Sequence, residues 1–174
     1  RLDRIISNFL EAIRPSEPDF RPVDLLTLLE EVLRLLEAEL EEKGVRVKVN
    51  LSEKLSPVYA DPDQVKQVFF NVIKNAADAM GKDPRLKVIM RSDEENVYLQ
   101  FIDSGKGISK EDLSKVFQPY FTTKKEGHGL GMMIVHRIMR AHGGQVGIDS
   151  NPDKGTLVTL QFPKANRSLR LLEH

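Results

Sequence analysis

The sequence predicts an α+β fold, in which helices pack on one face of a mixed, mostly antiparallel sheet to form a two-layer sandwich. Two observations lead to this prediction. Apolar residues recur at helical spacing in some segments and alternate with polar residues in others, so helices and strands are mixed along the chain. The strands also come in pairs joined by short turns, and they do not alternate regularly with helices.

Three helices are predicted in the body of the chain, at residues 24–43, 62–80 and 130–142. The first has Asp24 as a candidate N-cap and Gly44 just past its end, where a glycine commonly stops a helix. The second begins at Asp61-Pro62, which combines a capping carboxylate with a proline at the first helical position. Both helices therefore carry their own start signals.

Five strands are predicted, at residues 45–50, 86–91, 96–102, 145–150 and 156–162. Valines alternate with polar residues in the first strand. Polar turns join the second strand to the third and the fourth to the fifth. Residues 103–131 are rich in glycine and are predicted to be mostly irregular.

Composition excludes several classes of function. The 174 residues include 26 Lys and Arg and 26 Asp and Glu, so the formal net charge is zero. A general nucleic-acid binder would need a basic surface. The absence of cysteine excludes disulfides and thiolate metal sites. No apolar run is long enough to span a bilayer.

The helix at 62–80 carries an unusual polar face, formed by Gln67, Asn71, Lys74, Asn75 and Asp78. Most such faces are merely solvated, but solvated faces are rich in Glu, Lys and Arg. Each asparagine costs roughly a few tenths of a kcal/mol in a helix interior, so a pair of them needs a reason. An amide oxygen is a neutral, hard ligand that suits a Mg²⁺ ion already bound to phosphates.

The segment 103–108 follows a strand and begins with Asp103. A carboxylate at a strand end can accept a hydrogen bond from an exocyclic amine. The glycines of this segment would let the backbone approach a flat base without clashes from Cβ atoms. The alternative is a plain turn, because Asp and Gly are common turn residues.

The segment 127–131 contains three glycines and opens the third helix, so its backbone amides can bind phosphate oxygens. It is neither a P-loop nor a dinucleotide fingerprint, and a flexible hinge is the alternative. Just upstream, Thr122-Thr123-Lys124-Lys125 offers hydroxyls and cations, although two lysines are often only surface charge. No histidine pairs with a carboxylate at metal-ligand spacing, so no zinc site is predicted.

Together, these segments resemble the superfamily of ATP-binding domains found in histidine kinases, gyrase, Hsp90 and MutL. The segment 71–79 resembles the asparagine box. Segments 103–107, 117–121 and 127–131 resemble the first glycine, phenylalanine and second glycine boxes, and Gly155-Thr156 resembles the last glycine–threonine element. The match covers residues 20–164. Within the superfamily, segments 121–124 and 141–144 are similar to sensor histidine kinases of the nitrogen-regulation and sporulation type.

The resemblance implies a Bergerat-type ATP-binding fold with ATP and Mg²⁺ as cofactors. Asn75 would ligate Mg²⁺ with Asn71 assisting, and these two are the expected catalytic residues. Asp103 would bind the adenine amine, supported by Thr156. The other expected nucleotide-binding positions are Lys74, Asp78, Gly105, Gly107, Ile108, Thr122, Thr123, Lys124, Gly127, His128, Gly129, Leu130 and Gly131. Of these, Lys74 and Lys124 would contact phosphates. Many members have Lys or Arg where this sequence has Asp78. The phosphate contact that a basic residue would make at this position is therefore in question.

One position bears on the reaction. In the gyrase and Hsp90 branches, a glutamate that activates the attacking water occupies the place of Asn71. An amide cannot act as a general base at neutral pH. The sequence therefore predicts a protein-histidine kinase domain, which transfers the γ-phosphoryl group of ATP to a histidine on a separate dimerisation domain and does not phosphorylate itself. An ATPase, a serine kinase of the same superfamily and a non-catalytic nucleotide-sensing module are the alternatives.

The resemblance also implies a domain organisation. Residues 1–14 resemble the end of the second helix of a dimerisation domain, and 15–22, with three prolines, form a stiff linker. Residues 23–166 form the catalytic domain, and 167–174 are a tail with an expression-tag remnant. We interpret the chain as an excised fragment of a homodimeric kinase, cytoplasmic whether or not the full-length protein is membrane-anchored. The sequence leaves the oligomeric state of the fragment open, with a monomer as one alternative. Its expected partners are the dimerisation and phosphoacceptor helices of the same kinase and a response-regulator receiver domain, with no direct nucleic-acid contact.

Overall fold

The computed structural model describes residues 17–124 and 127–165. The predicted helix at 1–14, the start of the linker and the tail at 167–174 lie outside the described residues. The elements are, in chain order, β1 (Arg21–Val23), α2 (Leu25–Glu42), β2 (Arg46–Leu51), β3 (Val58–Ala60), α3 (Pro62–Ala79), β4 (Arg85–Ser92), β5 (Asn96–Asp103), α4 (Lys110–Leu113), α5 (Gly131–Ala141), β6 (Gln145–Ser150) and β7 (Thr156–Pro163).

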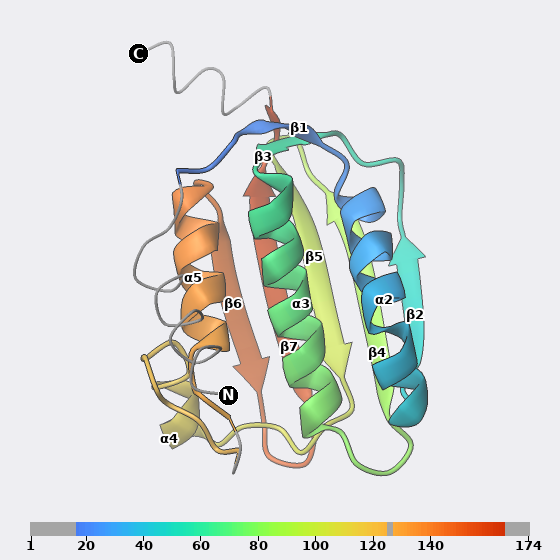
Figure 1. Cartoon of the computed structure of the whole chain (residues 1–174), viewed down its shortest axis with the longest axis vertical. Coiled ribbons are helices and arrows are strands. Elements are labelled where there is room, and N and C mark those ends of the chain that lie inside the picture. Colours follow the sequence, from blue (N-terminus) through green and yellow to red (C-terminus); the bar gives the residue numbers. More distant parts are fainter. Residues whose placement is uncertain (1–16, 125–126, 166–174) are drawn as a thin grey trace.

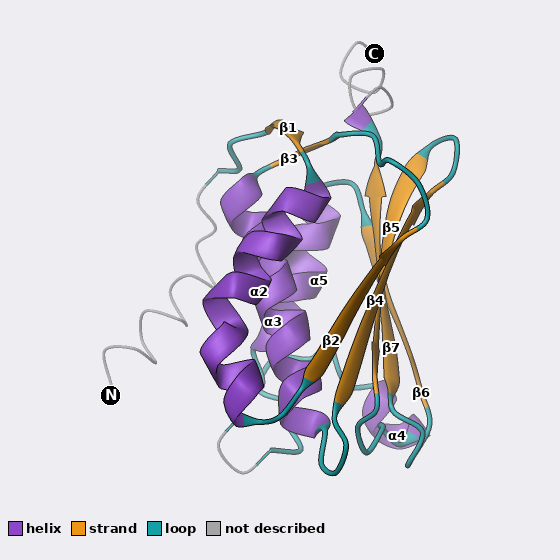
Figure 2. Ribbon diagram, turned by 90° about the vertical axis from the view of Figure 1, so that its right-hand side faces the viewer, coloured by secondary structure: helices purple, strands orange, loops and turns teal. Residues whose placement is uncertain are grey.

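These elements form two layers. Five strands build one sheet in the order β2-β4-β5-β7-β6, in which β2 and β4 are parallel and all other neighbours are antiparallel. Helices α2, α3 and α5 lie together on one face of this sheet (Figure 2). The prediction of an α+β two-layer sandwich with a mixed, mostly antiparallel sheet is confirmed.

Helix α3 lies between α2 and α5, over the middle of the sheet (Figure 1). Its Phe69 side chain is fully buried. The ring centroid of Phe69 is 6.0 Å from that of Phe101 on β5 and 6.5 Å from that of Phe162 on β7. Because the apolar side of α3 packs against the sheet, its polar residues lie between the two neighbouring helices, with Lys74 in contact with Glu39 of α2 and Asn71 close to Gly131 of α5.

The N-terminal end of α3 is densely hydrogen-bonded. The Asp61 carboxylate accepts hydrogen bonds from the backbone N–H groups of Asp63 and Gln64, at 2.9 and 3.1 Å. Its other oxygen accepts one from the N–H of Asp19 at 2.9 Å. The N–H of Asp61 itself donates to Nε2 of the buried His142, at 3.0 Å. The predicted N-cap therefore also joins α3 to the incoming chain and to the end of α5.

Two features of the fold are not predicted by the sequence. Strand β1 pairs with β3 in a separate two-stranded antiparallel sheet, so Arg21 and Pro22, placed in the linker by the sequence analysis, belong to the folded domain. Proline is tolerated there because β1 has only one neighbour. The short helix α4 lies in the region predicted as mostly irregular and is capped by Ser109, whose Oγ accepts a hydrogen bond from the N–H of Asp112.

Candidate functional site

A cavity of about 520 Å³ opens between the polar face of α3, the start of α5 and the adjoining ends of β5 and β7. Its size falls within the range of roughly 300–1,000 Å³ found for small-molecule sites. Every nucleotide-binding position predicted from the sequence lines this cavity except Gly105. The structure thus brings together segments that lie far apart in the sequence.

One end of the cavity holds a buried carboxylate. Asp103, the last residue of β5, is only 7% exposed. Its Oδ1 accepts a hydrogen bond from the N–H of Gly105 at 2.8 Å, and the backbone N–H of Thr156 also bonds to the carboxylate. Burial raises the pKa of Asp103, whereas these two hydrogen bonds act in the opposite direction. The carboxylate is therefore a fixed hydrogen-bonding group beside the cavity.

Ser150, at the end of β6, supports this wall of the cavity, and the sequence analysis missed it. Its buried hydroxyl accepts a hydrogen bond from the N–H of Ile108 at 2.9 Å and donates one to the carbonyl of Gly155 at 2.9 Å. It also lies 2.8 Å from Oγ1 of Thr156. Ser150 thereby links the segment after β5 to the start of β7. A serine that ends a strand carries no local signal of such a role.

Gly107 is needed for a reason that the sequence analysis did not anticipate. Its φ angle is +70°, and a Cβ at this position would lie 1.9 Å from the carbonyl oxygen of Asn151. The expectation that glycines here make room for a flat base is therefore incomplete, because the protein's own β6–β7 turn already occupies the space beside Gly107.

The other end of the cavity carries the two asparagines of α3. The first turn of α5 approaches them closely, because a Cβ on Gly131 would lie 3.5 Å from Oδ1 of Asn71 and 3.7 Å from Nδ2 of Asn75. No side-chain hydrogen bond from a described residue caps the N-terminus of α5. Amide side chains and the N-terminal N–H groups of a helix therefore meet here, and such N–H groups favour anions.

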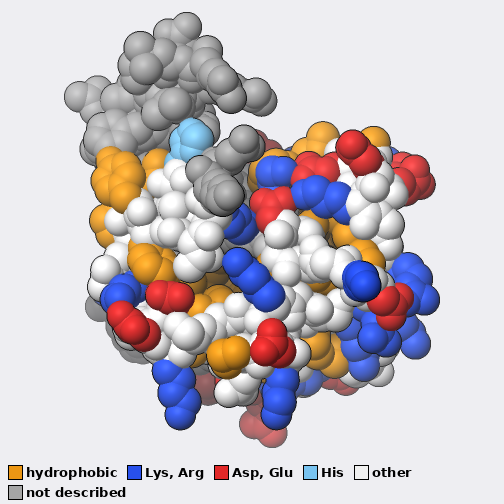
Figure 3. Space-filling model, turned by 90° about the horizontal axis from the view of Figure 1, so that it is seen from below, with side chains coloured by type: hydrophobic (Ala, Val, Ile, Leu, Met, Phe, Trp, Pro, Cys, Tyr) orange, Lys and Arg blue, Asp and Glu red, His pale blue; other side chains and the backbone are white. Residues whose placement is uncertain are grey.

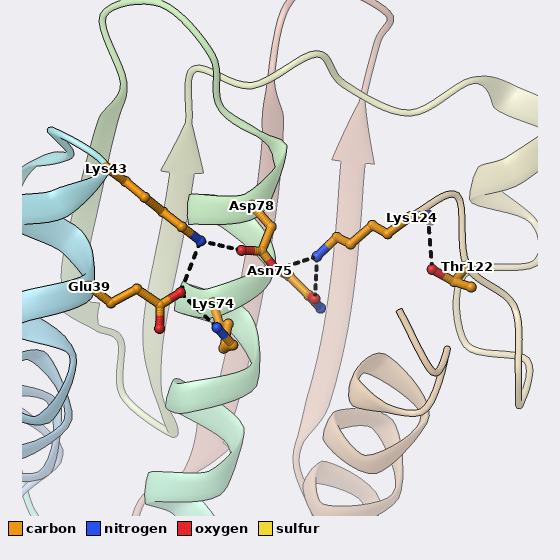
Figure 4. Close-up of polar contacts among 7 residues, drawn as sticks. All are labelled: Glu39, Lys43, Lys74, Asn75, Asp78, Thr122 and Lys124. Atoms are coloured by element: carbon orange, nitrogen blue, oxygen red, sulfur yellow. Dashed lines mark hydrogen bonds and ion pairs between the residues drawn. The ribbon is translucent and has the colours of Figure 1, made fainter. Parts of the chain in front are cut away.

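A chain of alternating charges borders this end of the cavity (Figure 4). We define the lysine–carboxylate chain as Lys74, Glu39, Lys43, Asp78 and Lys124, in order of contact. Lys74 Nζ lies 2.7 Å from Oε1 of Glu39, and Lys124 Nζ lies 3.1 Å from Oδ2 of Asp78. Lys124 Nζ also donates a hydrogen bond to Oδ1 of Asn75 at 3.1 Å.

The contacts within the lysine–carboxylate chain keep its two carboxylates ionised. Burial tends to raise the pKa of Asp78, but the hydrogen bonds from Lys43 and Lys124 outweigh it, so that pKa lies below its usual value. Hydrogen bonds from Lys74 and Lys43 likewise lower the pKa of Glu39. Both carboxylates are therefore ionised at neutral pH. Viewed from the end of the molecule shown at the bottom of Figure 1, basic and acidic side chains are interspersed (Figure 3).

The amide end of the cavity fits a magnesium ion that arrives with phosphates. Within residues 17–124 and 127–165, no three His, Asp or Glu side chains gather in a way that could hold a metal ion on their own. The donors at this end are neutral amide oxygens, which suit a Mg²⁺ ion whose charge is balanced by phosphate and which keeps several waters. Oδ1 of Asn75 accepts a hydrogen bond from the Lys124 ammonium, so this amide oxygen lies next to a positively charged group.

Comparisons with known proteins identify relatives. Residues 60–166 match the family described as histidine kinase-, DNA gyrase B-, and HSP90-like ATPase. Sensor histidine kinase ZraS of Escherichia coli K12 is 36% identical over 163 residues, which are 94% of this chain and 35% of ZraS. Sporulation kinase A of Bacillus subtilis is 33% identical over 165 residues, again 94% of this chain and 27% of that kinase. The chain thus spans about a third of the length of these relatives.

Solved structures agree with these matches. The catalytic domain of histidine kinase ThkA in a nucleotide-free form superposes with a TM-score of 0.78 at 29% identity, covering 86% of this chain and 98% of that domain. ThkA in complex with the response regulator TrrA superposes with a TM-score of 0.78 at 26% identity, covering 95% of this chain and 49% of ThkA.

Among the residues that the structure describes, none of the helices combines the length and the apolar character needed to cross a membrane. The family match covers more than half of the chain, and the matched residues include every described residue that lines the cavity. The chain belongs to the histidine kinase-, DNA gyrase B-, and HSP90-like ATPase family, and it is homologous to the ATP-binding catalytic domains of sensor histidine kinases.

Proposed function

We propose that this chain binds Mg-ATP in the cavity and transfers the γ-phosphoryl group to a histidine on the dimerisation helices of its own kinase. The observation that carries the proposal is the distribution of polar groups around one cavity. A buried carboxylate lies at one end, and amides, an ammonium and a helix N-terminus lie at the other. This arrangement suits a purine at the first end and a triphosphate at the second.

At the purine end, Asp103 accepts a hydrogen bond from the exocyclic amine of adenine. Its backbone partners and the Ser150 hydroxyl hold the neighbouring wall in place. Gly105, Gly107 and Ile108 form the segment beside the base, and Thr156 supports the carboxylate. Gly105 does not line the cavity, so its contribution is to shape the turn that presents Asp103.

At the triphosphate end, Asn75 holds Mg²⁺ and Asn71 assists. When bound, the metal ion neutralises phosphate charge and helps to align the γ-phosphoryl group. Lys124 and the N-terminal N–H groups of α5 contact phosphate oxygens. The remaining positions at this end shape the segment that covers the phosphates, namely Thr122, Thr123, Gly127, His128, Gly129, Leu130 and Gly131.

The cavity favours transfer over hydrolysis. Among its described lining residues the only carboxylates are Asp78 and Asp103, and there is no glutamate. Asp103 lies at the purine end, and Asp78 is held by two lysines, so neither is placed to activate a water beside the γ-phosphate. A neutral imidazole is itself nucleophilic and needs no such base. Catalysis then depends on positioning and charge stabilisation.

The proposal also includes the domain boundaries of the chain and its protein partners. Residues 1–14 belong to the dimerisation region and 15–20 to the linker. The catalytic domain extends from 21 to 166, because Arg21 and Pro22 pair with β3, and 167–174 are a tail. The acceptor is a histidine on the dimerisation helices of a homodimeric, cytoplasmic kinase region. The structure of ThkA with TrrA supports a response-regulator receiver domain as the next recipient of the phosphoryl group.

The test is a transfer assay with γ-labelled ATP, this chain and a separate protein that carries the dimerisation helices of the same kinase. We expect acid-labile label on the helices, dependent on both Mg²⁺ and this chain. Acid-stable label would indicate a serine kinase. Steady ADP release without acceptor, abolished in Asn71→Ala, would indicate an ATPase. Tight nucleotide binding without any label would indicate a sensing module.

A further inference from the structure

The lysine–carboxylate chain has an end that differs from its interior members. Lys43, Glu39 and Asp78 each contact two groups of opposite charge. Lys124 contacts a single carboxylate, that of Asp78, and completes its coordination with the neutral amide oxygen of Asn75. Lys74, Asp78 and Lys124 all line the cavity. Of the two lysines, Lys124 is the one that bonds to the amide oxygen to which the proposed function assigns Mg²⁺.

The backbone of Lys124 is fixed independently of its ammonium group. The N–H of Lys124 donates to Oγ1 of Thr122 at 3.0 Å, and its carbonyl accepts a hydrogen bond from the N–H of Gly127 at 3.3 Å. The long side chain can therefore exchange one set of partners for another while its backbone keeps the same local hydrogen bonds.

Releasing Lys124 would leave no carboxylate unpaired. Asp78 keeps its hydrogen bond from Lys43 at 2.5 Å on Oδ1, the oxygen that Lys124 does not use. Breaking an ion pair is costly when it strands a charge, and here it does not. The two side chains of the Lys124–Asp78 pair are also 33% and 29% exposed, so solvent screens their attraction.

We propose that Asp78 is a positioning residue that holds the Lys124 ammonium on Oδ1 of Asn75 before nucleotide binds, where it occupies the place of the metal ion. This inference rests on the proposed function. Arrival of a magnesium-bound nucleotide displaces the ammonium from Asn75, and the freed Lys124 contacts the phosphates. The carboxylate at position 78 thus holds a cation that is supplied by the segment before α5.

The test is a double-mutant cycle on binding of a non-hydrolysable ATP analogue with saturating Mg²⁺, measured by calorimetry at low salt. We expect Asp78→Asn to tighten binding about two- to fivefold, the scale of a partly exposed ion pair. In the Lys124→Met background the same change should alter affinity less than about twofold. Asp63→Asn is the matched control, because Asp63 pairs with Lys66 at the opposite end of α3, and it should leave affinity unchanged.

A second measurement separates this role from long-range electrostatics. Lys124→Met should weaken analogue binding at saturating Mg²⁺ and lower the Mg²⁺ concentration for half-maximal binding, because it removes both a phosphate contact and a competitor for Asn75. A weaker complex of Asp78→Asn, or an equal gain in both backgrounds, would overturn the inference alone. Absence of any analogue binding by the unmodified chain would overturn the proposed function as well.

Discussion

The two ends of helix α3 are built in opposite ways. At its N-terminus, the Asp61 carboxylate and the His142 ring form hydrogen bonds with backbone groups, and both residues are buried. Near its C-terminus, Asn75 and Asp78 have a lysine side chain from another segment as partner, beside an open cavity. At the N-terminal, closed end, the polar groups are buried and form hydrogen bonds with the backbone. At the C-terminal end, the partner is a side chain that a ligand can replace.

This difference indicates where stability and function reside along one helix. Fixed hydrogen bonds between buried groups stabilise the fold, and removing one partner leaves the other unsatisfied. Side-chain pairs that are screened by solvent contribute little to stability, which allows them to be replaced when a nucleotide binds. Substitutions at the two ends should therefore separate the free energy of unfolding from nucleotide affinity.

The largest effect on stability is expected from Asp61→Ala. We expect a loss of about 2 kcal/mol in the free energy of unfolding, because the N-cap and a buried acceptor of three backbone N–H groups are lost together. Chemical denaturation would measure it. The matched control is Asp24→Ala at the exposed cap of α2, which accepts one backbone hydrogen bond and should cost about 1 kcal/mol or less. A change in nucleotide affinity of the folded Asp61→Ala protein would contradict the separation of the two ends.

Asn75→Ala should give the opposite result. Alanine is a better helix former than asparagine by roughly 0.5 kcal/mol, so the unfolding free energy should stay the same or rise slightly. Affinity for a nucleotide analogue with Mg²⁺ should fall about tenfold, or about 1.4 kcal/mol, through loss of a metal ligand. Calorimetry with and without Mg²⁺ would check this. Equal weakening in the absence of Mg²⁺ would exclude the metal role.

Asp103→Asn provides the contrast within the cavity. The amide keeps the shape but presents an N–H₂ group on one side, where the carboxylate offers only acceptors. We expect about tenfold weaker nucleotide binding with an unchanged dependence on Mg²⁺ concentration, because the substitution lies at the purine end. If Asp103→Asn and Asn75→Ala gave the same Mg²⁺ dependence, the division of the cavity into two ends would be wrong.

The free energy of unfolding should depend on pH through His142, which lies at the N-terminal end of α3. Burial lowers the pKa of His142, while its bond to the carbonyl of Ile138 and the Asp61 carboxylate oppose this shift. A group whose folded-state pKa lies below its unfolded value of about 6.5 takes up its proton first in the unfolded chain. The contribution of His142 to the unfolding free energy should thus be constant above about pH 6.5 and fall as the pH drops below it, until the folded-state pKa is passed.

Denaturant unfolding across this pH range would measure the slope. Asp61 contributes separately at lower pH, because backbone hydrogen bonds outweigh burial and keep its pKa below the usual value. The substitution His142→Gln should reduce the slope. A slope that survives in His142→Gln would assign the effect to another group.

The sequence predicted most of the fold because its signals were local. Asp24 and Asp61 are N-caps in the structure, and Gly44 follows α2 with a φ angle of +68°, as the helix signals required. The strands at 145–150 and 156–162 were predicted almost to the residue, since alternation and a turn define them. The order of the motifs and their resemblance to the superfamily of ATP-binding domains predicted that the candidate residues share one site.

What the sequence could not predict depends on distant contacts or on very short elements. Strands β1 and β3 have three residues each, too few for periodicity to identify. Lys124 and Asp78 are 46 positions apart, and Lys74 and Glu39 are 35 apart, so no local pattern encodes these pairs. The same holds for Ser150, whose partner Ile108 lies 42 positions away.

The smallest effect is expected at Lys74, which the sequence analysis assigned to the phosphates. Its ammonium is 2.7 Å from Glu39 on α2, on the other side of α3 from Lys124 (Figure 4). Glu39 keeps Lys43 as a second partner, so Lys74→Met strands no charge, and its side chain is 40% exposed. We expect less than about 1 kcal/mol of lost stability and less than a twofold change in nucleotide affinity.

Calorimetry on Lys74→Met and Lys124→Met, under the same conditions, would compare the effects of the two lysines on nucleotide affinity. A loss of affinity in Lys74→Met as large as that in Lys124→Met would mean that Lys74 leaves Glu39 when nucleotide binds, and the exchangeable part of α3 would then extend one turn further toward its closed end.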